Sequence, residues 1–352
     1  MVGKVYIVQP EVARPQGGVN VAFSFAELLA KNGQPASVHF QTDSFVYPFV
    51  DSAPDTTFSP FSEPGPDNLR AWMKHLRRTA KTPKPKRVPR SNRAQMPDPG
   101  DFVILPEYSY HLQADRFGDV PHGVLVQDVY GGLRGTFRPL AQGLKRSPAL
   151  RGFITTSQAS SELVSSLSDL PHAKVPLFVD SKAFSYVEPK KRQIAVMPRK
   201  RRADVETMVD LIRAEPRLAG FETCLIEGVP YERVLEILGE SLIFLSFSWQ
   251  EGFGLPPAEA MARGCIVIGY PGIGGREYFD PAYSYPVPDD DFAGFFGRIC
   301  EVCAAYDAGP AEFDAMRRRA SEAILGRYTR EKTQASLMRA VADLAPHLPQ
   351  RP

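Results

Sequence analysis

Residues 242–269 read LIFLSFSWQEGFGLPPAEAMARGCIVIG and carry the clearest structural signal in the chain. Two apolar runs, 242–246 and 265–269, have the length and composition of buried strands. Between them lie a loop with two glycines and a helical segment that opens with Pro256 and Pro257, and proline is tolerated in the first turn of a helix. A strand, a helix and a second strand in this order predict one unit of a parallel sheet.

The chain on either side of this unit alternates in the same way. We expect further strands at 4–9, 36–40, 102–105, 123–127, 152–155, 174–179, 194–197 and 221–226. Helices are expected at 19–31, 203–214, 231–239 and 256–263, and packing helices at 289–306, 310–326 and 330–344. The predicted fold class is therefore α/β, with two Rossmann-like units that face each other across a cleft.

Changes in composition predict the domain boundaries. We place a first domain at 1–180, a second at 181–328 and a C-terminal helix at 329–352. Residues 46–100 form an insert in the first domain, because they are rich in proline and poor in strand patterns.

Charge is balanced overall and uneven locally. The 352 residues include 42 Lys and Arg against 40 Asp and Glu, and this balance argues against a nucleic-acid-binding protein. Residues 70–93, the basic segment, hold ten basic residues and no acidic one. The basic segment is either a solvated loop or a contact with an anionic surface, since each cation near anionic lipid contributes about 1 kcal/mol.

The cellular compartment is predicted from three features that the sequence lacks: a membrane span, a signal peptide and a disulfide framework. No apolar run approaches the roughly 20 residues of a membrane span, and the first residues look like a strand rather than a signal peptide. Four cysteines make no disulfide framework. We therefore expect a cytoplasmic protein, and attachment to the inner face of the membrane through the basic segment stays an open alternative.

The glycine loop between the two strands has the chemistry of a ligand site. It follows the carboxyl end of a parallel strand, where open α/β sheets bind ligands, and Gly252 and Gly254 let backbone N–H groups approach a phosphate. Glu251 and Glu259 bracket the loop, and a carboxylate can accept hydrogen bonds from both hydroxyls of a sugar diol. As isolated residues, they are better explained as a solvated acid and a first-turn acid that favours the helix dipole.

The string Glu251-Gly-Phe-Gly-Leu-Pro-Pro-Ala-Glu259-Ala-Met-Ala-Arg-Gly resembles the E-x7-E signature of the retaining glycosyltransferases of family four, the glycosyl transferases group 1. The resemblance implies the GT-B architecture, with the last helix crossing back to the first domain. It implies that Glu259 holds the ribose of a nucleotide. The residues it assigns to the donor sugar are Glu251 and the backbone amides of Gly252, Phe253, Gly254 and Leu255.

Three further segments match the family pattern. Met197-Pro-Arg-Lys-Arg-Arg202 follows a strand where the family places an Arg and a Lys on the donor diphosphate, which implies that Arg199 and Lys200 neutralise the leaving group. We expect Arg201 and Arg202 to be solvated. Gln16-Gly-Gly-Val19 resembles the glycine loop beneath the diphosphate, which implies roles for Gly17 and Gly18. In the loop 269–279, Gly274, Gly275 and Glu277 resemble a further donor-side loop, although the Glu comes one residue early.

The acceptor side departs from the family pattern. Many members carry a His at the end of a first-domain strand, and here Gln127 and Asp128 stand in its place. Either side chain could bond a sugar hydroxyl, and Asp128 could act as a base, or the pair could simply cap a strand end. His111 is the other candidate, with a packed or surface residue as its alternative interpretation.

The resemblance implies transfer of a sugar, with retention of configuration, from a nucleotide-diphosphate donor to a glycan, lipid-linked or other cell-surface polysaccharide acceptor. It implies no cofactor and no metal, since Arg and Lys supply the positive charge. We assign Cys300 and Cys303 to the core and the run 289–291 to a helix cap. Two alternatives stay open: a non-catalytic adaptor that binds an anionic surface through residues 70–93, and a sugar-nucleotide epimerase.

Overall fold

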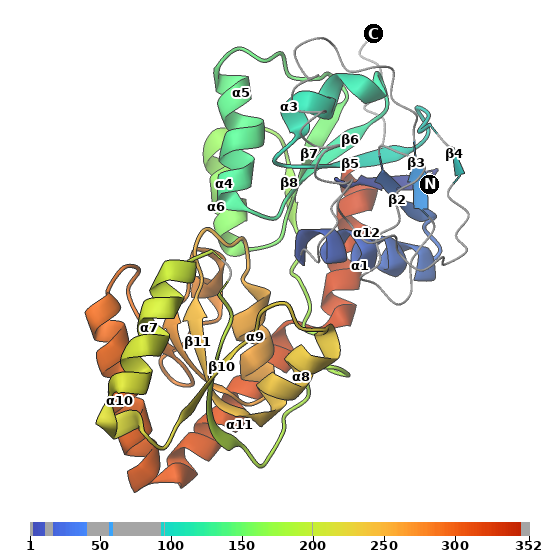
Figure 1. The fold of residues 1–352 in the computed structure, drawn as a ribbon. Coiled ribbons are helices and arrows are strands. Elements are labelled where there is room, and N and C mark those ends of the chain that lie inside the picture. Colours follow the sequence, from blue (N-terminus) through green and yellow to red (C-terminus); the bar gives the residue numbers. More distant parts are fainter. Residues whose placement is uncertain are drawn as a thin grey trace.

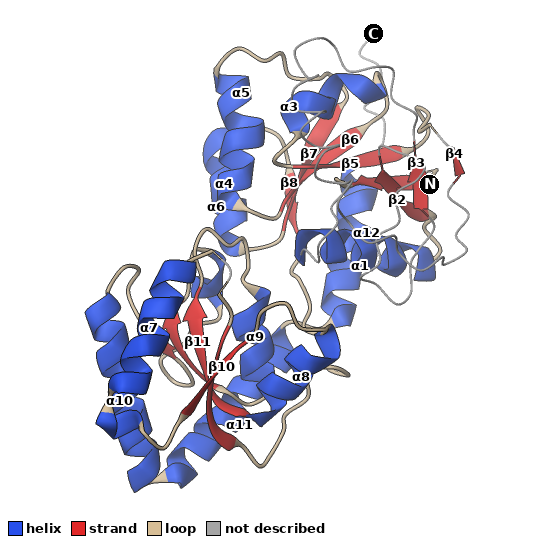
Figure 2. Ribbon diagram, viewed as in Figure 1, coloured by secondary structure: helices blue, strands red, loops and turns tan. Residues whose placement is uncertain are grey.

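The computed structural model describes residues 3–10, 17–40, 56–58, 93–94, 96–198 and 200–345. Two parallel sheets form two lobes, which we call the first and the second domain, and helices pack against each sheet (Figures 1 and 2). The predicted alternation of strands and helices is therefore present in both halves of the chain. The basic segment, apart from the backbone of its last residue, lies outside the described residues.

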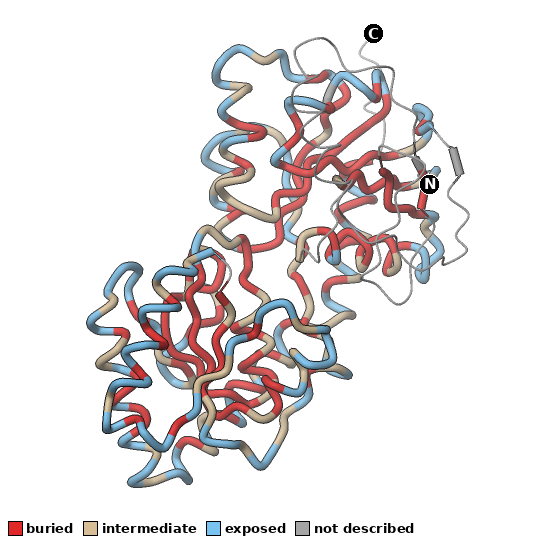
Figure 3. Tube along the Cα trace, in the orientation of Figure 1, coloured by how far each residue is buried: buried red, intermediate tan, exposed pale blue. Residues whose placement is uncertain are grey.

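The first domain contains eight parallel strands in the order β4-β3-β2-β1-β5-β6-β7-β8. Strands β1, β5 and β6 are completely buried (Figure 3), which explains their almost uninterrupted apolar sequences. The strands are β1 (Val5–Val8), β2 (Ala36–Phe40), β3 (Thr56–Phe58), β4 (Arg93–Ala94), β5 (Phe102–Pro106), β6 (His122–Val126), β7 (Leu150–Thr155) and β8 (His172–Lys174). The helical elements are α1 (Gly17–Lys31), α3 (Tyr110–Gln113), η2 (Ala114–Phe117), α4 (Val129–Gly132), η3 (Leu133–Phe137), α5 (Arg138–Ala141) and α6 (Gln158–Leu167).

The second domain contains five parallel strands in the order β10-β9-β11-β12-β13. They are β9 (Lys191–Val196), β10 (Glu222–Leu225), β11 (Ser241–Phe247), β12 (Ile266–Tyr270) and β13 (Tyr285–Pro286). The helical elements are α7 (Arg202–Ala214), η4 (Pro216–Leu218), α8 (Tyr231–Glu240), α9 (Leu255–Ala262), η5 (Gly274–Glu277), α10 (Phe292–Ala308) and α11 (Pro310–Arg327). The quoted stretch 242–269 thus forms β11, α9 and most of β12, as its pattern predicts.

In each sheet the strand order reverses once, at a topological switch point. In the second sheet the change falls between β9 and β11, and in the first it falls between β1 and β5. Ligands of open α/β sheets bind at such points, outside the carboxyl ends of the strands. The loops that follow β9 and β11 are therefore the expected ligand-binding part of the second domain.

The chain crosses between the domains twice. Residues 175–190 lead from β8 to β9, and α12 (Arg330–Leu344) returns to pack against α1, β7 and β8. In α12, Thr333 Oγ1 donates to the Pro176 carbonyl at 2.7 Å, and Gln334 Nε2 donates to Asn32 Oδ1 at 2.6 Å. At the crossing itself, the backbone N–H of Val179 donates to the Tyr328 carbonyl at 3.0 Å.

Three details of the predicted secondary structure are wrong. The expected strand at 174–179 is the short strand β8, which ends before Pro176 because proline has no N–H to donate. The insert at 46–100 contributes β3 and β4 to the sheet edge. Strand β13 has only two residues and shows no periodicity that a sequence could reveal. Within the described ranges, no helix is both long and apolar enough to cross a bilayer.

Candidate functional site

Lys200 lies at the centre of the candidate site, in the loop between β9 and α7. Its ammonium donates to the Gln250 carbonyl at 2.6 Å and lies 3.5 Å from Glu251 Oε1. On its other side, Asp128 Oδ2 of the first domain is 3.9 Å away. The three charged side chains are partly exposed. The structure therefore brings together two predicted donor-side residues and one predicted acceptor-side residue from opposite domains.

The glycine loop after β11 approaches the first domain so closely that only glycine fits. A Cβ atom on Gly252 would lie 1.3 Å from the carbonyl oxygen of Gln127. Gly254 has a φ of +82° and is the N-cap of α9, and its carbonyl accepts a hydrogen bond from the Tyr278 hydroxyl. The Phe253 side chain is buried against Tyr278. Residue 253 can therefore meet a ligand only through its backbone, as the resemblance implies.

Glu259 lies in α9 and is half-buried. Burial raises the pKa of the neighbouring Tyr278 well above its ordinary value, and the negative charges of Glu251, Glu277 and Glu259 contribute further. All three carboxylates are thus near enough to act electrostatically on one buried phenol. The arrangement keeps both acids of the E-x7-E signature on the same part of the second domain.

On the first-domain side, the start of α1 and the end of β6 touch. Gln127 Nε2 donates to the Gly18 carbonyl at 3.2 Å, next to Gly17, where α1 begins. Asp128 is the N-cap of α4, with Oδ1 accepting from the backbone N–H of Tyr130 at 2.8 Å. Asp128 therefore caps the helix that follows the strand, and its second oxygen lies 3.9 Å from the Lys200 ammonium.

Glu107, directly after β5, is a member of this site that the sequence did not single out. Its side chain is buried, and Oε1 accepts from the backbone N–H of Asp128 at 3.1 Å. Burial raises the pKa of Glu107 to about 8, and the charge of Asp128 adds to the effect. The other oxygen, Oε2, has no hydrogen-bond partner among the described residues. Its only sequence signal is a charged residue at the carboxyl end of an apolar strand.

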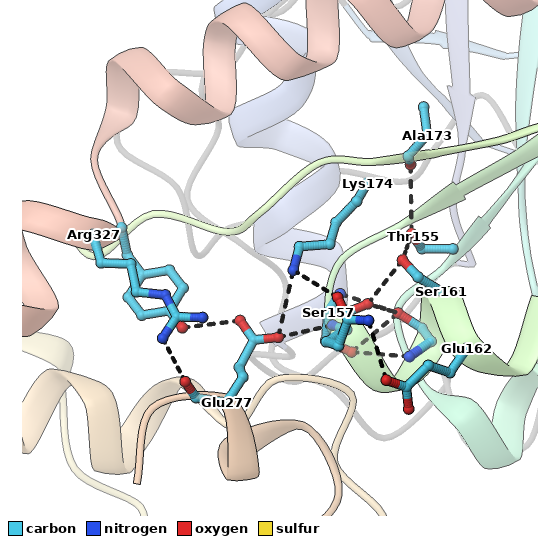
Figure 4. A network of polar contacts seen from close by, with 11 residues as sticks. Thr155, Ser157, Ser161, Glu162, Ala173, Lys174, Glu277 and Arg327 are labelled. Carbon is cyan, nitrogen blue, oxygen red and sulfur yellow. Dashed lines mark hydrogen bonds and ion pairs between the residues drawn. The ribbon is translucent and has the colours of Figure 1, made fainter. Parts of the chain in front are cut away.

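Glu277 belongs to the loop that resembles a donor-side loop of the family. Its carboxylate bonds to the first domain, where the backbone N–H of Gln158 donates to Oε2 at 2.8 Å (Figure 4). Gly274, three residues earlier, does contact the glycine loop, because its N–H donates to the Glu251 carbonyl at 3.2 Å.

Two other residues were predicted for the site. His111 lies in α3, is exposed, and has Nδ1 2.9 Å from the Gly135 carbonyl. Arg199 lies outside the described residues, so that its proposed contact with a diphosphate stays a prediction.

The expectation that Arg201 is solvated is wrong. Its side chain is only 11% exposed and pairs with Asp204 at 3.3 Å and with Asp290 at 2.5 Å. The guanidinium also lies over the rings of Tyr270 and Trp249, at 4.9 and 5.8 Å from their centres. Arg201 therefore fixes the loop that carries Lys200. Arg202, by contrast, forms exposed ion pairs with Glu206 and Glu227.

The described residues contain no cluster of three or more His, Cys, Asp or Glu side chains that could hold a metal ion. Asp291 caps α10, with Oδ1 accepting from the Gly294 N–H at 2.9 Å, as predicted for the acidic run before that helix. Cys300 and Cys303 are buried in the core. Whether the reaction needs a metal stays a prediction from the resemblance.

Comparison with known proteins supports the sequence resemblance. Residues 213–291 match the family model described as glycosyl transferases group 1. An alpha-1,6-glucosyltransferase of Actinobacillus pleuropneumoniae serotype 7 (strain AP76) is 34% identical over 80 residues, which are 22% of this chain and 24% of that protein. The match therefore spans about a quarter of the curated relative.

Solved structures are similar over nearly the whole chain. A TarM variant of S. aureus, bound to fondaparinux, alpha-GlcNAc-glycerol and UDP, superposes with a TM-score of 0.68 at 9% identity, covering 96% of this chain and 99% of TarM. Sucrose-phosphate synthase from Thermosynechococcus elongatus gives 0.66 at 12% identity, covering 97% and 99%. Anabaena HepE with UDP and glucose gives 0.65 at 11% identity, covering 97% and 100%. The predicted resemblance and the GT-B fold are confirmed.

Proposed function

We propose, from the group 1 glycosyltransferase signature in residues 213–291 and the GT-B fold of the whole chain, that this protein transfers a sugar from a nucleotide diphosphate to an acceptor hydroxyl. The observation that carries this proposal is the meeting of Lys200, Glu251 and Asp128 in front of the glycine loop. A cation, a carboxylate and free backbone amides are the groups that a diphosphate sugar requires.

In the proposed reaction, the bond between the anomeric carbon and the diphosphate oxygen breaks, and the acceptor oxygen bonds to the same face of that carbon. Lys200, Arg199 and the N-terminus of α9 stabilise the departing negative charge, without a metal ion. Glu251 and the amides after it orient the sugar, and Glu259 binds the ribose. The acceptor proton passes to the departing phosphate oxygen, while Asp128 and Gln127 bind the acceptor.

A glycan or a lipid-linked saccharide is the proposed acceptor, with the basic segment 70–93 as the contact to an anionic membrane. This part rests on charge alone, and sedimentation with vesicles tests it. Binding that is equal with neutral and anionic vesicles would remove the membrane contact from the proposal.

The test is donor binding and turnover. UDP is the nucleotide in the TarM and HepE complexes, so that UDP sugars come first in the panel, followed by GDP and dTDP sugars. We expect one nucleotide to raise the melting temperature. Lys200→Ala and Glu251→Ala should each lower turnover about 100-fold or more, because each removes a group that stabilises or orients the reacting atoms. Anomeric configuration of the product, read by NMR, tests retention.

A surface variant serves as control. Lys182→Ala changes an exposed lysine in the crossing segment and should leave turnover unchanged. Wild-type rates in folded Lys200→Ala and Glu251→Ala proteins would remove the assignment. Salt-sensitive binding of polyanions without any nucleotide effect would favour the adaptor, and release of an altered donor without acceptor would favour the epimerase.

A further inference from the structure

Glu277 joins the second domain to the first. Its side chain is only 7% exposed, although it carries a carboxylate. Oε2 accepts from the Gln158 N–H at 2.8 Å and lies 4.0 Å from the Lys174 ammonium, and Oε1 accepts from the Tyr328 hydroxyl at 2.9 Å. Figure 4 shows Lys174 facing Glu277. Gln158 and Lys174 belong to the first domain, and Tyr328 lies at the crossing into α12.

The first-domain side of this contact is firmly built. Ser157 caps α6 in a reciprocal capping box with Ser160, so that the Gln158 N–H has a fixed direction. Lys174 Nζ also donates to Gln158 Oε1 at 3.3 Å, and Gln158 Nε2 donates to Glu162 at 3.1 Å. A lysine and the positive end of a helix therefore compensate the negative charge of Glu277.

The second-domain side leads directly to the glycine loop. Gly274, at the start of η5, donates its N–H to the Glu251 carbonyl, and a Cβ atom on Gly274 would lie 1.8 Å from the Gly252 carbonyl oxygen. Tyr278, next to Glu277, donates its hydroxyl to the Gly254 carbonyl. The residues on both sides of Glu277 thus contact the loop that carries Glu251.

We propose that Glu277 is a positioning residue that couples docking of the first domain to the geometry of the loop 251–254. Its carboxylate holds the start of α6 while its neighbours hold the glycine loop, so that the two domains close only with that loop in place. The assignment of a catalytic consequence rests on the proposed function. The coupling itself is a property of the contacts.

Glu277→Gln tests the coupling without reference to activity. It keeps the size of the side chain and loses the charge that faces Lys174 and α6. Hydrogen exchange should accelerate at the Gln158 amide, whose acceptor is Glu277, and also at the Gly274 amide, whose acceptor is the Glu251 carbonyl. Small-angle scattering should show a more open molecule. Glu162→Gln is the matched control, because it removes a carboxylate of the same network whose hydrogen-bond partner, Gln158, belongs to the first domain. Wild-type exchange at both places in Glu277→Gln would overturn the proposal.

Kinetics give the second readout. If the domains close less often, kcat of Glu277→Gln should fall about tenfold while KM for the donor changes less than about twofold. Lys174→Met should have a smaller effect in the same direction, and the double variant should be non-additive because both changes act on one contact. If KM for the donor rose about tenfold while kcat stayed unchanged, Glu277 would contact the donor directly. That result would contradict a positioning role. A wild-type protein without turnover would defeat the proposed function, while the exchange measurements would still decide the coupling.

Discussion

Glu107 shows how a single buried acid makes a site depend on pH. Its carboxyl holds the backbone of Asp128 in place, and burial raises its pKa from an ordinary 4.5 to about 8. In the unfolded chain this group loses its proton near its ordinary pKa. Between these two values the native state therefore binds more protons than the unfolded state.

This difference predicts a pH-dependent stability. The free energy of unfolding should fall as pH rises from about 4.5 to 8, by at most about 1.4 kcal/mol per pH unit for one proton. Glu107→Gln stays neutral at every pH and should flatten this slope. Urea unfolding at several pH values measures it, with the exposed Glu301→Gln as control. An unchanged slope in Glu107→Gln would show that Glu107 is ionised in the native protein.

At this scale, the sequence predicted residues that belong to one contiguous motif. Glu251 and the glycines after it were singled out because the string that contains them resembles the E-x7-E signature. Glu277 could not be placed, because its partner Gln158 is 119 residues away. The expectation that Arg201 is solvated failed for the same reason, since the rings that cover it belong to Trp249 and Tyr270, which are distant in the sequence.

Among the elements, the turn from β11 into α9 is the most constrained. Gly252 faces the Gln127 carbonyl, a backbone atom that cannot rotate away as a side chain can. Gly252→Ala should therefore separate the glycine loop from the first domain and lower sugar transfer about 10- to 100-fold, because reacting groups lose their alignment. Steady-state rates with a UDP sugar measure the effect.

Gly297→Ala is the matched control, because the Cβ of an alanine in α10 would meet nothing within 4 Å. It should keep its activity and gain about 0.5 to 1 kcal/mol of stability, as expected for alanine in place of glycine inside a helix. Equal activity of the two variants would show that the approach of Gly252 to Gln127 is not required for transfer.

Elements with a long apolar run were predictable, and short edge strands were not. The strand β11 and the helix α9 follow from periodicity, and their observed ends differ from the expected ones by one residue. The strands β3, β4 and β13 have two or three residues, too few for a period-2 pattern, and only the neighbouring strand makes them regular. The prediction of strands therefore failed where the strands are very short.

In the whole molecule, two α/β units were predictable from the alternation of strands and helices, but the contact between them was not. No single segment encodes that Gly252 meets Gln127 or that Lys200 meets Asp128, because these pairs form only when both sheets are complete. The packing of α12 on the first domain could not be predicted for the same reason. Its sequence shows an amphipathic helix and not the surface that it covers.

The position of α12 leads to a prediction about the stability of the whole molecule. This helix follows the second domain in sequence and packs on the first, where Leu337 is completely buried. Leu337→Ala should cost about 2–5 kcal/mol and should act on the first domain, so that hydrogen exchange accelerates in α1 and β8 more than in β11. Leu167→Ala, at a side chain that is 49% exposed, should change stability by less than about 0.5 kcal/mol. If exchange in β11 accelerated as much as in α1, the two domains would unfold as one unit and α12 would not be a support of the first domain alone.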